Sequence, residues 1–355
     1  MKILYITNME WKLVVGRHQM MYYQMEKMKK YDCTVVDVHK VFRNHKHVQK
    51  ENKFPSDYRL AYQFPYQYES AISRFLTAMS YKAVMKDIKD YDFIWIGGPE
   101  LIRYIPKDYT GKILYDCMDN YENFTKKQSR KAKVREMEKE CIRRAEIVLS
   151  TSEVLCDRIR SLVPGSKPML VRNAYDGKAV HTVKETQKKA EYRIGFIGAI
   201  AQWVDLDILV NNAYKQHNVT YHLVGPYGSK REDCNKLIYE GSREHSKLYE
   251  TIQDYDCLVM PFYINELTKA VDPVKLYEYI AFGKCIISSY YEEIERFGPF
   301  VYFYHNEEEY HELVRKLAEE GFPPKYTDEM QREFLQENTW EERFKAVDRM
   351  LSEYC

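Results

Sequence analysis

The chain has 355 residues, which is too long for one ordinary domain and long enough for two that each bury a core. Its 54 Lys and Arg residues nearly balance its 53 Asp and Glu residues, so a net charge of +1 argues against a nucleic-acid-binding protein. Its eight cysteines include no C-x-x-C pair, and we expect reduced core residues rather than disulfides or zinc ligands.

Short apolar segments alternate with helical patterns in the first half of the chain. Strands are predicted at 2–7, 33–38, 92–97, 112–116 and 146–150. Helices are predicted at 17–30, 69–89, 124–144 and 152–162. Such alternation is typical of a parallel sheet with helical crossovers. The basic and aromatic stretch 39–67 contains Pro55 and Pro65 and is predicted to be a long loop or irregular insertion.

A second alternating pattern follows a predicted linker at 163–189, which contains Pro164-Gly165 and a lysine-rich stretch. Strands are predicted at 192–198, 219–225, 256–262, 285–289 and 300–304, and an amphipathic helix at 338–351. We therefore predict an α/β protein of two doubly wound domains, 1–170 and 171–337. The first segment is too short for a signal peptide core, and no window approaches the roughly 18 apolar residues of a membrane span, so we expect a cytoplasmic protein.

The segment Val271–Lys284 carries the most specific pattern. Asp272 is a suitable helix N-cap, Pro273 suits the first helical position, and Gly283 suits the end of the helix. Lys275 and Glu278 are three residues apart, so they share one face near the helix N-terminus. There the cation can hold a phosphate and the carboxylate can hold hydroxyl groups. An ordinary surface ion pair is the alternative.

With the strand 256–262 before it and the strand 285–289 after it, this segment resembles the donor-binding signature of GT-B-fold glycosyltransferases. The K-L-Y-E-Y helix is most similar to divergent bacterial polysaccharide and teichuronic-acid-type transferases, related to the retaining group 1 enzymes. The resemblance implies two Rossmann-like domains that face a cleft, with a C-terminal helix, 338–355, that crosses back to an N-terminal acceptor-binding domain. The C-terminal domain would bind the nucleotide-sugar donor.

The donor site implied by this resemblance comprises Gly198, Trp203, Gly225, Asn265, Thr268, Lys275, Tyr277 and Glu278. Glu278 matches the second of the family's paired glutamates, which binds the ribose hydroxyls. The first glutamate would fall at 270, where this chain has Ala270. We therefore expect the diphosphate to lie against the backbone of the loop from Asn265 to Val271.

The loop after strand 192–198 lacks the basic residues that clamp the diphosphate in many relatives. Backbone N–H groups around Gly198 are an alternative phosphate site. Trp203 either stacks on a base or sugar or packs between elements. Asp205-Leu206-Asp207 matches a metal-binding D-x-D motif, but it opens a helix, so Asp205 is predicted to be a helix cap and no metal is expected.

Two groups of residues follow strands of the first half. Asp119 comes after the strand 112–116 and is the predicted catalytic carboxylate, whereas Asp116 lies closer to the strand and suits a structural role. Gly16, Arg17 and His18 follow the first strand and are predicted to touch the acceptor or the donor phosphate. A helix cap is the ordinary alternative for Asp119.

These features predict a glycosyltransferase that moves a sugar from a nucleotide-sugar, a UDP-sugar, to a polysaccharide or lipid-linked acceptor without a cofactor. Lys275 and Asp119 are its expected catalytic residues. The alternatives are a sugar-nucleotide epimerase or hydrolase of the same fold, and a non-catalytic nucleotide-sugar or glycan-binding partner. The segment 126–144 carries nine basic and three acidic residues, so it is either a solvated basic face or a site for the anionic inner face of the cell membrane.

Overall fold

The computed structural model divides into two compact units, Met1–Arg172 with Trp340–Cys355, and Asn173–Thr339. It describes residues 1–12, 16–42, 53–175, 177, 180–183, 186–228, 232, 234–244 and 247–354. The predicted domain boundary at 170/171 falls beside the observed division. None of the helices in these described ranges is long and apolar enough to cross a membrane.

Unit 1 is built on a seven-stranded sheet in the order β3-β2-β1-β4-β5-β6-β7, with every neighbouring pair parallel. Its strands are β1 (Lys2–Ile6), β2 (Asp32–Lys40), β3 (Asp57–Gln63), β4 (Phe93–Ile96), β5 (Lys112–Cys117), β6 (Ile147–Ser150) and β7 (Met169–Leu170). Its helices are α1 (Arg17–Met28), α2 (Ala71–Val84), α3 (Gln128–Arg144), α4 (Glu153–Leu162) and α10 (Trp340–Ser352).

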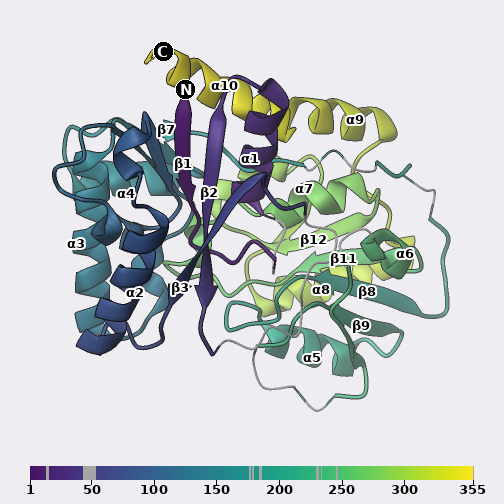
Figure 1. Ribbon diagram of the computed structural model, residues 1–355. Helices are drawn as coiled ribbons and strands as arrows, with labels where there is room; N and C mark the ends of the chain where they lie inside the picture. Colours follow the sequence, from purple (N-terminus) through teal and green to yellow (C-terminus); the bar gives the residue numbers. More distant parts are fainter. Residues whose placement is uncertain are drawn as a thin grey trace. The chain divides into compact units, whose positions relative to one another are not determined.

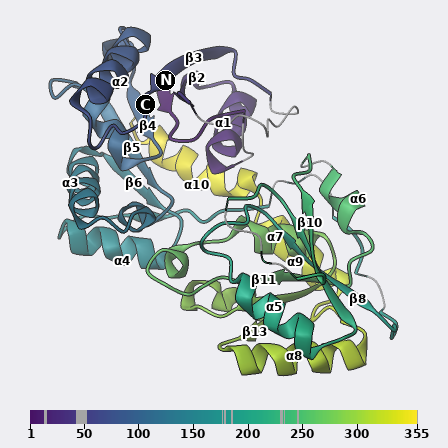
Figure 2. The same ribbon diagram turned by 90° about the horizontal axis from the view of Figure 1, so that it is seen from below.

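The helices of unit 1 cover both faces of its sheet (Figures 1 and 2). Helices α1 and α10 pack together on one face, whereas α2, α3 and α4 lie on the other. This division follows from right-handed crossovers that run in opposite directions from β1 and from β4. The C-terminal helix belongs to unit 1, where Tyr31 Oη donates to Asp348 at 2.5 Å, and this confirms the predicted return of the chain.

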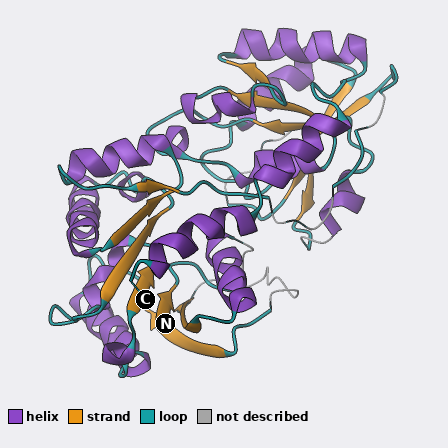
Figure 3. Ribbon diagram, turned by 90° about the horizontal axis from the view of Figure 1, so that it is seen from above, coloured by secondary structure: helices purple, strands orange, loops and turns teal. Residues whose placement is uncertain are grey.

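Unit 2 contains a six-stranded parallel sheet in the order β10-β9-β8-β11-β12-β13. Its strands are β8 (Tyr192–Ile197), β9 (Val219–Val224), β10 (Leu237–Gly241), β11 (Cys257–Met260), β12 (Cys285–Ser289) and β13 (Tyr302–Tyr304). Its helices are α5 (Leu206–Lys215), α6 (Leu248–Ile252), α7 (Val274–Ala281), α8 (Glu307–Glu320) and α9 (Asp328–Glu337). Helices α5 and α8 contact each other, as do α7 and α9, and in each unit helices flank the strands (Figure 3).

The predicted α/β class and two doubly wound sheets are confirmed, but three strands were missed. Strand β3 lies inside the predicted loop 39–67, of which residues 43–52 are outside the described ranges. Strand β7 lies in the predicted linker, and β10 forms an edge of the second sheet. Six of the cysteines are buried free thiols in the described part of the chain, as predicted (Cys117, Cys141, Cys156, Cys234, Cys257 and Cys285).

In each sheet, successive strands are first added toward one edge and then, from one point on, toward the other edge. In unit 1 the chain turns back between β1 and β4, and in unit 2 between β8 and β11. Loops that leave the carboxyl ends of strands diverge at such a point, which is where doubly wound proteins bind ligands. The segments after Ile197 and Met260 therefore mark the candidate site of unit 2.

Candidate functional site

Helix α7 carries Lys275 and Glu278 three residues apart on one face, and both side chains are partly exposed. Leu276, Tyr279 and Ile280 are completely buried and pack the helix into the core of unit 2. Tyr279 Oη accepts a hydrogen bond of 3.0 Å from the backbone N–H of Ile197, at the end of β8. This contact fixes α7 on the sheet where the strand order reverses.

The ammonium group of Lys275 lies in an apolar setting beside this point. Its Nζ is 5.8 Å from the ring centroid of Phe196 on β8 and 5.9 Å from that of Phe262 after β11. Burial lowers the pKa of Lys275, and the nearby charge of Glu278 opposes this shift. No carboxylate in the described ranges pairs with Nζ at salt-bridge distance. A partly desolvated cation without a counter-ion favours an anionic ligand.

The first turn of α7 adds backbone donors to the same place. The helix begins after Pro273 and has no side-chain cap, so the prediction that Asp272 caps it is wrong. The Asp272 carboxylate is buried instead, where it accepts from the backbone N–H of Asn173 at 2.6 Å and pairs with Arg296. The first turn of α7 and Lys275 thus bring backbone N–H groups and a cation together, an arrangement that suits an anion.

Two glycines shape the backbone next to Lys275. Gly198 has φ +138°, and a Cβ there would lie 2.2 Å from Lys275 Cε. Gly225 has φ +147°, and a Cβ there would lie 2.0 Å from the carbonyl oxygen of Gly198. Both positions therefore require glycine, for conformation and for space. The N–H of Gly198 donates to Val224 O at 2.8 Å. This amide is therefore not available to a phosphate, although the sequence analysis gave the N–H groups around Gly198 as an alternative phosphate site.

The loop between β11 and α7 is closed by its own hydrogen bonds. Asn265 Oδ1 accepts from the N–H groups of Leu267 and Thr268, and Thr268 Oγ1 accepts from Asn265 N. The N–H groups of Lys269 and Val271 donate to carbonyls of the same loop. The loop therefore uses the amides of Asn265, Leu267, Thr268, Lys269 and Val271 itself, which leaves less of its backbone for a diphosphate than we expected. Asn265 and Thr268 shape the loop rather than offer free polar groups.

Three further assignments change in unit 2. Tyr277 is completely buried and its hydroxyl contacts Asp272 and Arg296, so it anchors α7 and does not face a ligand. Trp203 is partly buried and packs against the hydrophobic core, which favours the packing alternative. Ala270, at the position where the resemblance places the first glutamate, is completely buried.

The carboxylates of Asp205 and Asp207 both accept hydrogen bonds within unit 2. Asp205 Oδ1 accepts from Ile208 N at 3.0 Å and caps α5, as predicted. Asp207 accepts from the hydroxyl of Tyr263 at 3.0 Å. Across the described ranges, no group of three or more His, Cys, Asp or Glu side chains is arranged to hold a metal ion.

In unit 1, the side chains of Arg17 and His18 are buried. The Arg17 Nε donates to both carboxylate oxygens of Asp116, at 3.1 and 2.9 Å, and Nη1 donates to Arg172 O. Burial lowers the pKa of His18 to about 4, so its imidazole is neutral near pH 7. Gly16 is the N-cap of α1. Arg17 Nη2 and His18 Nε2 are buried without a hydrogen-bond partner in the described ranges, so the contact of Gly16, Arg17 and His18 with the acceptor or the donor phosphate stays a prediction. The structural role of Asp116 agrees with its ion pair to Arg17.

Asp119 follows β5 at the carboxyl edge of the first sheet and is partly exposed. Its carboxylate makes no hydrogen bond to a residue of the described ranges, and burial raises its pKa to about 7. It does not cap η3 (Tyr121–Phe124), because no side chain caps this turn. A carboxyl group whose pKa lies near neutrality can accept or donate a proton at physiological pH.

The sequence analysis missed the neighbours of Asp119. Tyr121 Oη accepts from Asn8 Nδ2 at 3.3 Å and donates to Gly97 O at 2.5 Å, which joins the loops after β1, β4 and β5. A Cβ at Gly98 would lie 3.0 Å from the Asn8 side chain. The signal was present as polar or glycine residues directly after three predicted strands, Asn8, Gly97-Gly98 and Asp119.

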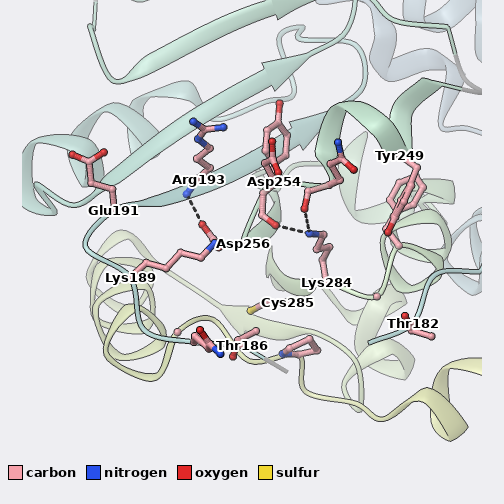
Figure 4. Close-up of a pocket in the computed structure, with 17 residues that line it drawn as sticks. Thr182, Thr186, Lys189, Glu191, Arg193, Tyr249, Asp254, Asp256, Lys284 and Cys285 are labelled. Atoms are coloured by element: carbon pink, nitrogen blue, oxygen red, sulfur yellow. Dashed lines mark hydrogen bonds and ion pairs between the residues drawn. The ribbon is translucent and has the colours of Figure 1, made fainter. Parts of the chain in front are cut away.

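Another hollow, of about 550 Å³, lies at the amino ends of β8, β11 and β12 (Figure 4). Two of its cations already have partners: Lys189 Nζ lies 2.5 Å from Asp256, and Lys284 Nζ donates to the carbonyls of Gln253 and Tyr255. This edge is opposite to the carboxyl ends of the strands, so we assign it no role in donor binding.

Comparison with known proteins agrees with this geometry. No family model matches the chain. It is 22% identical over 216 residues to "Putative teichuronic acid biosynthesis glycosyltransferase TuaH" of Bacillus subtilis (strain 168), which covers 54% of each protein. The chain thus spans about half the length of this curated relative.

Solved structures cover the whole chain. The sucrose-phosphate synthase of Thermosynechococcus elongatus superposes with a TM-score of 0.77 at 11% identity, over 99% of both chains. Anabaena Alr3699/HepE, in complex with UDP and glucose, superposes with a TM-score of 0.70 at 12% identity, also over 99% of both chains. The chain has the GT-B fold. The predicted resemblance to GT-B-fold glycosyltransferases is confirmed.

Proposed function

We propose that this protein is a glycosyltransferase that moves a sugar from a UDP-sugar to a polysaccharide or lipid-linked acceptor. The observation that carries the proposal is Lys275, a partly desolvated cation without a counter-ion in the described ranges, at the uncapped N-terminus of α7. A diphosphate supplies the charge that this site lacks. Glu278 lies one turn along the same face, where a carboxylate suits ribose hydroxyls.

In the proposed reaction, the bond between the anomeric carbon and the diphosphate breaks, and the diphosphate keeps the electron pair. Lys275 and the first-turn N–H groups of α7 stabilise this leaving charge. The acceptor oxygen bonds to the anomeric carbon, and its proton goes to the carboxylate of Asp119, whose pKa of about 7 suits a general base.

Similar proteins support the class of reaction. The matching Bacillus subtilis protein is described as a teichuronic acid biosynthesis glycosyltransferase, and HepE was solved with UDP and glucose. For this chain we propose a nucleotide-linked hexose as the donor and a cell-surface glycan or its lipid-linked precursor as the acceptor.

Calorimetric titration with UDP tests the donor site. Lys275→Ala should weaken UDP binding about 10- to 100-fold, because it removes a charge-assisted contact worth roughly 1.5–3 kcal/mol. Glu278→Gln should weaken binding about tenfold, with a smaller effect on chemistry. Lys269→Ala is a matched control, because Lys269 lies on the adjoining loop and pairs with Glu266. Equal UDP affinity in the wild type, Lys275→Ala and Glu278→Gln would refute the site.

A further inference from the structure

Four cations of unit 1 gather around one tyrosine. The carbonyl oxygen of Tyr68 accepts from Arg74 Nη1 at 3.4 Å and from Lys133 Nζ at 3.1 Å. Two guanidinium groups lie beside the ring of Tyr68, with their central carbons 5.6 Å (Arg103) and 4.1 Å (Arg130) from its centroid. Burial raises the pKa of Tyr68 to about 12, so its hydroxyl is neutral near pH 7 and offsets none of this positive charge.

These cations contact neutral groups, and among the residues that the structure describes no carboxylate lies at salt-bridge distance from any of them. Arg103 Nη2, for example, donates to Gln67 Oε1 at 2.9 Å. Two carboxylates are nearby: Glu136, whose charge is offset by an ion pair of 2.8 Å within α3, and Glu100, whose charge acts on Tyr68. The four cations outnumber these carboxylates, and their mutual repulsion favours an anion among them.

The cations border a hollow of about 580 Å³. Binding sites for small ligands span roughly 300–1,000 Å³, so the hollow has a suitable size. Its walls include the side chains of Ala132 and Met137 and the ring of Tyr68. Three of the four cations line it (Arg74, Arg103 and Lys133). Apolar walls beside fixed cations suit a sugar ring that carries an anionic group.

The hollow belongs to the carboxyl edge of the unit 1 sheet. It is bordered by the segment after β3, by η2 (Pro99–Tyr104) after β4 and by α3 after β5. Asp119 leaves the same edge, directly after β5. Arg135 of α3 pairs with Glu122 of η3 at 2.7 Å, so α3 is fastened to the turn that follows Asp119. The hollow and the proposed base are therefore parts of one edge of one sheet.

We propose that this hollow binds an anionic sugar residue of the acceptor glycan, one that carries a carboxylate or a phosphate group. That the glycan is the acceptor rests on the proposed function, whereas the anion site stands on its own contacts. The fork of a guanidinium group matches both anions, and the contacts of Arg74 and Lys133 with a single carbonyl oxygen leave N–H donors for a ligand. A planar lipid surface suits the site less well, because the cations line a concave wall.

The basic segment 126–144 divides into two groups on this account. Several of its cations hold carboxylate or amide groups of unit 1 (Lys131, Arg135, Lys139 and Arg144). Arg130 and Lys133 belong to the anion site instead. Lys126 and Lys127 are exposed beside α3, and their contact with a membrane stays a prediction.

Calorimetric titration with two pairs of sugars tests the site. Tetragalacturonate and maltotetraose have equal length and differ in carboxylate charge, whereas mannose 6-phosphate and mannose differ in phosphate charge. The wild type should bind the charged member of at least one pair about tenfold or more tightly than the neutral member, and should lose this preference as ionic strength rises.

The double variant Arg103→Gln/Lys133→Gln should weaken binding of the preferred sugar about 10- to 100-fold, because it removes two charge-assisted contacts. Lys86→Gln/Lys107→Gln is the matched control and should bind as the wild type does. Both lysines are exposed, in segments that lead to the amino ends of β4 and β5. Thermal melting checks that each variant is folded.

UDP titration of the same variants separates this site from the proposed reaction. UDP affinity should be unchanged in Arg103→Gln/Lys133→Gln, because the proposed donor site is in unit 2. No preference for the charged sugar in either pair would overturn the proposal, even if the protein transfers sugar to a neutral acceptor. So would undiminished binding by Arg103→Gln/Lys133→Gln, or phosphatidylglycerol vesicles in place of the sugars as the ligand that this variant loses. Selective sugar binding without turnover of any UDP-sugar would refute the proposed reaction and retain the anion site.

Discussion

Asp119 is the residue whose proposed chemistry depends most directly on its surroundings. Because burial raises its pKa to about 7, it is protonated at acidic pH and becomes a base near neutrality. We expect kcat/KM to rise as the pH increases through about 7. Asp119→Asn should lower kcat about 10²- to 10⁴-fold and should abolish the rise of kcat/KM with pH. A pH–rate profile measures both, and a wild-type profile that is flat from about pH 5 to 8 would contradict the role.

The same shift has a consequence for stability. A carboxyl group with a raised pKa binds more protons in the folded state between about pH 4 and 7, so the folded state loses stability as the pH rises through this range. Asp119→Asn removes the penalty and should raise the free energy of unfolding by about 1–3 kcal/mol above pH 7, with no gain near pH 4. Urea unfolding at the two pH values measures the difference.

At the scale of elements, the ends of β8 and β9 approach Lys275 closely, because Gly198 lies against the Lys275 side chain and Gly225 lies against the backbone of Gly198. Gly225→Ala should destabilise the protein by more than about 2 kcal/mol, because the new Cβ meets the rigid backbone of Gly198. Gly198→Ala should cost about as much stability as the φ change alone and should in addition weaken UDP binding, because its Cβ meets the flexible end of Lys275. Gly165→Ala is the control for φ alone, since Gly165 has φ +90° and open space around it, and should cost about 1 kcal/mol.

Urea unfolding and UDP titration of the three glycine variants separate these effects. If Gly225→Ala were no more destabilising than Gly165→Ala, the close contact between the two loops would not constrain the fold. Normal UDP affinity in Gly198→Ala would show that the position of Lys275 tolerates displacement.

The sequence predicted those elements whose apolar periodicity is strong. The central strands and the face of α7 that carries Lys275 and Glu278 were found in this way, since burial dictates their pattern. Edge strands β3 and β10 are half exposed and lack a continuous apolar run, so they were missed. Contacts between distant residues were also hidden: Asp272 pairs with Arg296, and Arg17 pairs with Asp116 from 99 residues away.

For the whole molecule, the donor site predicts that activity does not need a divalent ion. Lys275 and helix N–H groups neutralise the leaving diphosphate in this account, and Asp205 and Asp207 are used by α5 and Tyr263. Turnover should therefore persist in EDTA. Loss of activity in the chelator and its recovery with manganese or magnesium would require a metal site and would reopen the role of Asp205.

The measurement that bears most directly on the central claim is turnover with a panel of nucleotide sugars. Wild-type protein and Lys275→Ala would each be incubated with UDP-hexoses and a glycan acceptor, and released UDP and new glycoside would be quantified. We predict that the wild type consumes at least one UDP-sugar and transfers its sugar, and that Lys275→Ala is slower by about 10²-fold or more. Equal turnover by the two proteins, or UDP binding without consumption of any donor, would contradict the account.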